Sequence, residues 1–100
     1  MNRIVLQLWE ESGRGWGVRP DGCSIHMDLA ERDRYVDSIY SARRGSDSVP
    51  EEYDRIVGMP VEAYIDDTLF GYLMSEKSIR LAQHQMNNLV KMEDIIIRNE

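Results

Sequence analysis

The sequence lacks most of the features that assign a function directly. Its 100 residues include one cysteine, so the chain can form no internal disulfide. No uninterrupted apolar run exceeds four residues, whereas a membrane-spanning helix needs roughly 20. A basic-then-apolar leader of the secretory kind is also missing before the first strand-like segment. We therefore expect a soluble, cytoplasmic protein that does not cross a membrane.

Metal and nucleotide motifs are equally scarce. A structural zinc site usually takes four Cys or His ligands at close paired spacings. The chain has three such residues in total, none of them paired: Cys23, His26 and His84. The acids do not follow calcium-loop spacing, which leaves only the adjacent Asp66 and Asp67 as carboxylates that could meet a Mg²⁺ ion. We expect no metal and no cofactor.

Residues 13–17 read Gly-Arg-Gly-Trp-Gly and superficially suggest a phosphate-binding loop. They lack the Lys-Ser/Thr ending of such a loop, and they lie between two strand-like segments instead of before a helix. Glycines between strands are typical of a tight turn that needs positive φ. The sequence therefore predicts a hairpin turn here.

Positive charge is in deficit, with 12 lysines and arginines against 18 acids and a net charge of −6 at pH 7. The whole excess lies in residues 46–67, the acidic segment, which holds seven acids and one base, Arg55. Such a charge repels polyanions and speeds encounters with basic partners. We expect no direct nucleic-acid binding, and a protein partner with a basic surface.

Hydrophobic periodicity predicts one small α+β domain over residues 1–100. Alternation over residues 3–10 predicts a first strand. Residues 16–19 and 23–27 predict two more strands, separated by a Pro-Asp-Gly turn at residues 20–22. The N-terminal quarter is thus expected to be a three-stranded meander.

Two main helices are predicted. Asp28 followed by Glu31 is typical of a helix start, and apolar residues then recur at helical spacing up to Gly45. Asp66 or Asp67 is expected to cap the second helix, over residues 68–76.

The acidic segment and the last quarter are harder to interpret. Proline at position 50 followed by two glutamates favours a helical turn, ended by Gly-Met-Pro at residues 58–60, with a strand over residues 61–65. Residues 79–97 favour a C-terminal β-hairpin, and the alternative is a long C-terminal helix.

The candidate nucleophile and base do not combine. Cys23 and His26 are three residues apart on one predicted strand, so their side chains should lie on opposite faces. We expect Cys23 to be a buried core thiol and His26 to be a surface or hydrogen-bonded histidine. A small enzyme or ligand-binding domain that uses His26 with His84, or Asp66 with Asp67, is one alternative.

Residue types enriched at protein interfaces are the remaining signal. Arg14 and Trp16 lie at the predicted turn, and Tyr53 lies between two acids. Helix ends account for several acids of the acidic segment, but not for Asp47, Asp54 or Glu62. The expected partner-binding residues are Arg14, Trp16, Asp47, Tyr53, Asp54 and Glu62.

These observations favour a non-enzymatic, acidic protein-binding module, such as an inhibitor or immunity protein that occupies a basic surface of another protein, for example a surface that binds nucleic acid. In size, acidity and lack of catalytic motifs the chain is similar to small phage inhibitors of bacterial defence enzymes and to toxin-immunity proteins. A second alternative is a structural subunit, such as a homodimer, that pairs through an exposed edge at the isoleucine-rich C-terminal strand.

Overall fold

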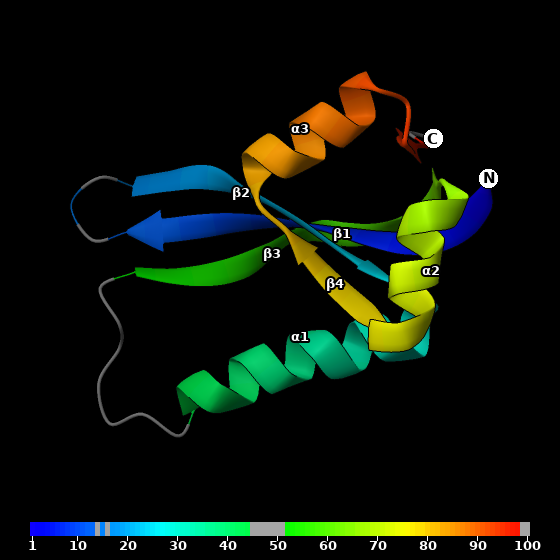
Figure 1. Ribbon diagram of the computed structural model, residues 1–100. Coiled ribbons are helices and arrows are strands. Elements are labelled where there is room, and N and C mark those ends of the chain that lie inside the picture. The colour runs from blue at the N-terminus through cyan, green and yellow to red at the C-terminus, as the bar shows by residue number, and fades with distance from the viewer. Residues whose placement is uncertain (14, 16, 45–51, 99–100) are drawn as a thin grey trace.

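The computed structural model describes residues 1–13, 15, 17–44 and 52–98. A five-stranded antiparallel sheet in the order β4-β2-β1-β3-β5 is accompanied by three helices within these residues (Figure 1). The strands are β1 (Asn2–Gly13), β2 (Gly17–His26), β3 (Glu52–Ile65), β4 (Ser78–Leu81) and β5 (Ile95–Ile97). The helices are α1 (Leu29–Arg44), α2 (Asp67–Glu76) and α3 (Gln83–Lys91). The predicted α+β class is confirmed.

Both predicted helix starts are confirmed, because each cap makes its expected hydrogen bond. The backbone N–H of Glu31 donates to Asp28 Oδ1 at 2.9 Å, and that of Leu69 donates to Asp66 Oδ1 at 2.9 Å. Each aspartate satisfies one of the N–H groups that a helix leaves without an internal partner. The first helix ends at Arg44, one residue before the predicted stop.

The two faces of the sheet differ in chemistry. One face forms the main core with Leu73 of α2 and Met86 of α3, and its buried strand residues are Ile4, Leu6, Cys23, Ile25, Ala63, Ile65, Leu81 and Ile95. On the other face Trp9 and His26 meet the ring of Tyr35 from α1. Figure 1 shows α1 and α3 on opposite sides of the strands. The sheet is therefore apolar on one side and largely polar on the other.

The predicted three-stranded meander is wrong, because residues 17–26 form one strand and not two strands separated by a turn. The β1–β2 pairing passes from Leu8↔Cys23 to Glu10↔Pro20, so Asp21 and Gly22 together lie opposite Trp9 as a bulge. Gly22 has φ +78°, and its N–H donates to the Gln83 side chain at 2.8 Å. The turn-forming residues thus bend a strand without ending it.

The helical turn predicted in the acidic segment is also wrong where the structure describes it. Residues 52–65 form the strand β3, and Gly58-Met59-Pro60 lies inside it, since the β1–β3 pairing passes from Leu6↔Val61 to Leu8↔Val57. The buried Gln7 amide donates to the carbonyls of Val57 and Gly58 at 3.2 Å each. A side chain distant in sequence therefore supplies the hydrogen bonds that the bulge removes from the ladder.

The last quarter forms neither the predicted hairpin nor the alternative long helix. Strand β4 pairs with β2, whereas β5 pairs with β3, so the two strands lie at opposite edges of the sheet and α3 connects them. Strands of four and three residues are too short for periodicity to identify.

The three longest strands extend beyond the rest of the sheet, away from α2 (Figure 1). Strand β4 pairs only with Cys23–His26 of β2, and β5 pairs only with Ala63–Ile65 of β3. Residues 8–13, 17–22 and 52–58 therefore form a three-stranded projection, which we call the outer arm. Its two faces and two edges carry the candidate functional groups.

Candidate functional site

A chain of buried polar side chains lies on the α1 side of the sheet. Trp9 Nε1 donates to Ser24 Oγ at 2.8 Å, Ser24 Oγ lies 2.7 Å from His26 Nε2, and His26 Nδ1 lies 2.7 Å from Ser78 Oγ. Burial, followed by the charge of Arg32, lowers the pKa of His26 to about 4. The imidazole is neutral at pH 7, with both nitrogens occupied. His26 is thus the hydrogen-bonded histidine of the two predicted possibilities.

Cys23 lies on the opposite face, as predicted, and belongs to the main core. Burial raises the pKa of its thiol to about 12, an effect that the charge of Arg80 partly offsets. The thiolate required of a nucleophile is therefore unfavourable at neutral pH.

The other residues of the enzymatic alternative are not brought together. His84 is exposed on α3, whereas His26 is fully buried on the α1 side of the sheet. Asp66 caps α2, and Asp67 accepts a hydrogen bond from the Asn2 side chain at 2.9 Å. Within the described part of the chain, no group of three His, Cys, Asp or Glu residues could hold a metal ion.

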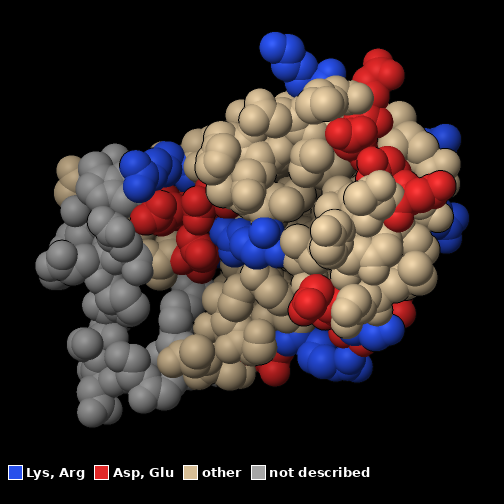
Figure 2. Space-filling view, in the orientation of Figure 1, with Lys and Arg blue, Asp and Glu red and all other residues tan. Residues whose placement is uncertain are grey.

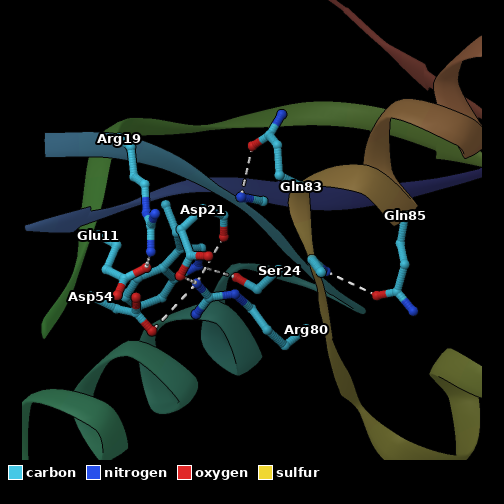
Figure 3. A network of polar contacts seen from close by, with 11 residues as sticks. Glu11, Arg19, Asp21, Ser24, Asp54, Arg80, Gln83 and Gln85 are labelled. Atoms are coloured by element: carbon cyan, nitrogen blue, oxygen red, sulfur yellow. Dashed lines mark hydrogen bonds and ion pairs between the residues drawn. The ribbon is translucent and has the colours of Figure 1, made fainter. Parts of the chain in front are cut away.

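The α1 side of the outer arm carries a cluster of charged groups (Figure 3). Arg80 Nη2 lies 3.1 Å from Asp21 Oδ2 and 3.5 Å from Asp54 Oδ2, and its guanidinium lies 4.6 Å from the centroid of the Trp9 ring. We call Arg80, Asp21 and Asp54 the arginine clamp. It connects β4, β2 and β3 across the central strand β1.

Asp54 is the titratable group of this cluster. Burial, followed by a side-chain hydrogen bond with Asp21, raises its pKa to about 6, while the charge of Arg80 acts in the opposite direction. Glu11 lies nearby and is paired with Arg19 at 3.2 Å. Asp54 therefore has a structural role within the fold, which its sequence context did not reveal.

On the opposite face of the outer arm, apolar side chains are exposed beside the Glu10–Arg55 ion pair. Leu8, Val18 and Val57 are 37%, 48% and 39% exposed, and together with Pro20 they line a groove of about 410 Å³ that ends at Met86 of α3. Leu8 and Val57 are direct cross-strand partners. We call these four residues, Leu8, Val18, Pro20 and Val57, the outer apolar face.

The backbone edges of the outer arm are partly closed. On β3, the N–H of Ile56 donates to the hydroxyl of Tyr40 at 3.1 Å. On β2, the N–H of Gly22 donates to Gln83, and Pro20 has no N–H to offer. These features oppose the addition of another strand, as in many natural sheets. The open surface of the arm is therefore its apolar face.

The predicted partner-binding residues do not form one surface where they can be placed. Arg14, Trp16 and Asp47 lie outside the described residues. Tyr53 is half-buried, Asp54 belongs to the arginine clamp, and Glu62 is exposed beyond the β3 bulge, where it accepts a hydrogen bond from Tyr64 Oη at 2.5 Å. Figure 2 shows acidic residues gathered in a band at the upper right of the view, away from the outer arm, and mixed with basic residues elsewhere on the described surface in view. Residues 52–65 of the acidic segment are thus extended along a strand.

Sequence reasoning did not find the outer apolar face. Leu6 and Leu8 alternate in the same way, yet Leu6 is fully buried and Leu8 is exposed. Leu6 and Leu8 differ in exposure because α3 covers only part of the sheet, and the local sequence pattern does not indicate where this cover ends. The only available signal was that β-branched Val18 and Val57 lie next to turn-forming residues.

Comparison with protein-family models, curated proteins and solved structures finds no significant match to this chain. Among the described residues, no helix has both the length and the apolar character needed to cross a membrane.

Proposed function

We propose that this protein is a non-enzymatic binding module that attaches to another protein through the outer apolar face. The partner presents apolar side chains surrounded by lysines and arginines. The observation that supports this proposal is the contrast within the outer arm: three large apolar side chains are exposed on one face, while α1 and the arginine clamp cover the other.

Apolar contact and net charge have separate roles in this proposal. Burial of the three exposed side chains contributes about 1 kcal/mol each, because part of each side chain is already buried in the free protein. The net charge of −6 speeds the approach of a basic partner. Salt should therefore slow association and leave dissociation nearly unchanged.

Occupation of a basic surface makes the protein an inhibitor or immunity factor when that surface normally binds nucleic acid or substrate. The proposed compartment is the cytoplasm, where the buried free thiol of Cys23 stays reduced.

The test is a comparison of two matched variants. In the first, Leu8→Thr, Val18→Thr and Val57→Thr remove apolar surface while keeping a residue type that favours strands. In the control, Val90→Gln and Met92→Gln remove two exposed apolar side chains from the α3 region, which are 39% and 71% exposed. The partner is first captured from extract of the native host, then purified, and its affinity is measured by calorimetry.

We expect the arm variant to lose about 30-fold or more in affinity and the control to bind like the wild type. Equal affinity of the arm variant and the wild type would contradict the proposal, as would an equal loss in the control. Circular dichroism of both variants establishes that the fold is intact.

A further inference from the structure

The arginine clamp places two carboxylates on a single nitrogen atom. Asp21 Oδ2 and Asp54 Oδ2 both lie within 3.5 Å of Arg80 Nη2, and all three side chains are partly buried, with 24% exposure for Arg80 and 35% for each aspartate. Two like charges held this close in a half-buried site repel each other more strongly than they would in water. One arginine cannot neutralise both.

The neighbouring elements supply no further free cation within the described residues. On β1, Glu11 adds a third carboxylate, and Arg19 of β2 is already paired with it. The cavity beside the clamp has a volume of about 530 Å³, and Arg80 is the one cation among its described lining residues: Asp21, Tyr35, Ile39, Asp54, Arg80, Ala82 and Gln85. With every group ionised, the cluster of three carboxylates and two arginines has an excess negative charge.

We propose that Asp21 and Asp54 share one proton under mildly acidic conditions, and that this proton closes the arginine clamp and tightens the attachment of the outer arm to the sheet. The protonated carboxyl donates a hydrogen bond to the ionised one, and Arg80 then neutralises the single remaining charge. This inference concerns the arm itself and does not depend on the proposed binding function.

The direction of the pH effect follows from Asp54. Its pKa of about 6 in the folded protein lies above the ordinary value of 3.8, so the folded state binds this proton more tightly than an opened arm does. Protonation of Asp54 stabilises the attached arm fully below pH 3.8, and this stabilisation is lost as the pH rises through about 6. The arm is therefore most firmly attached in mild acid and loosest above neutrality.

Amide hydrogen exchange at about pH 5 and pH 7.5 tests the proposal. After correction for intrinsic exchange, amides of residues 8–12, 18–19, 21–22 and 53–57 should be protected about three- to tenfold more at the lower pH. Core amides of residues 4–6 and 63–65 serve as the internal reference. His26, whose pKa is lowered, destabilises the whole protein in acid, and the reference amides measure that separate effect.

The Asp54→Asn variant should abolish this difference, because the amide donates to Asp21 at both pH values as the protonated carboxyl does. Asp21→Asn, which removes the like charge in a second way, should move the response to lower pH. Glu10→Gln is the control, since Glu10 pairs with Arg55 and not with the clamp. An unchanged pH response in both clamp variants, or a loss of the response in the control, would overturn the proposal.

Discussion

Arg32 of α1 and Gln7 of β1 meet at one oxygen atom. Nε and Nη2 of Arg32 both donate to Gln7 Oε1, at 3.0 Å and 2.7 Å. Gln7 is fully buried, and its amide nitrogen donates to the carbonyls of Val57 and Gly58 in the β3 bulge. One glutamine side chain of β1 therefore connects α1, on the polar side of the sheet, to the bulge in the neighbouring strand β3.

Replacement of this side chain should be costly. Gln7→Leu leaves Nε and Nη2 of Arg32 and the bulge carbonyls without their partner, and we expect the free energy of unfolding to fall by about 2–4 kcal/mol. Gln85→Leu is the control: it removes one exposed hydrogen bond, from the backbone N–H of Ala82 to Gln85 Oε1 at 2.9 Å, and should cost about 1 kcal/mol. Urea unfolding measures both. A Gln7→Leu variant as stable as the wild type would show that the connection has no net value.

Two glycines with similar backbone angles should respond differently to alanine. Gly22 and Gly58 have φ of +78° and +66°, a region that L-residues adopt at a cost of about 1 kcal/mol. A Cβ at Gly22 would lie 1.9 Å from the carbonyl oxygen of Leu81, whereas a Cβ at Gly58 would meet nothing within 4 Å. Gly58→Ala should therefore cost about 1 kcal/mol.

Gly22→Ala should cost at least about 3 kcal/mol or prevent folding, since the backbone of β4 and α3 must move away. Thermal unfolding compares the two variants in one experiment. Equal melting temperatures would mean that the close approach of Leu81 to the β2 bulge is not maintained in solution.

These bulges also explain what the sequence could and could not predict. Helix caps at Asp28 and Asp66 were predictable, because a cap depends on residues within one turn. The placement of Cys23 and His26 on opposite faces followed from strand alternation alone. The continuity of β2 through Gly22 depends on Gln83, which is distant in sequence, so local turn signals gave the wrong division of strands.

The candidate site was harder to predict for the same reason. The position of Asp54 is explained by Arg80, which arrives from β4 at the other edge of the sheet. From the sequence alone, the acidic neighbours of Asp54 suggested a charged patch that faces solvent, because the contact with Arg80 could not be foreseen. Leu8 is likewise exposed because α3 does not extend over it, and the position of α3 is defined only in the assembled fold.

His26 should remain neutral over the ordinary pH range. Its pKa of about 4 lies below the usual 6.5, so the unfolded chain binds the proton first and acid removes stability as the pH falls from about 6.5 towards 4. Nuclear magnetic resonance of the His84→Gln variant, which retains a single histidine, should show no imidazole titration between about pH 5 and pH 8. A midpoint near 6.5 would contradict the burial of His26 between Ser24 and Ser78.

The central claim is that the outer apolar face is the surface that contacts a partner. Photocrosslinking tests it most directly, with a photoactivatable residue placed at Val57 in one protein and at Met92 in another, each exposed to extract of the native host. We predict that position 57 crosslinks to a different protein, within a segment where apolar residues are flanked by lysine or arginine, and that position 92 does not. Crosslinks from position 92 alone, or from position 57 only to other copies of this chain, would contradict the claim.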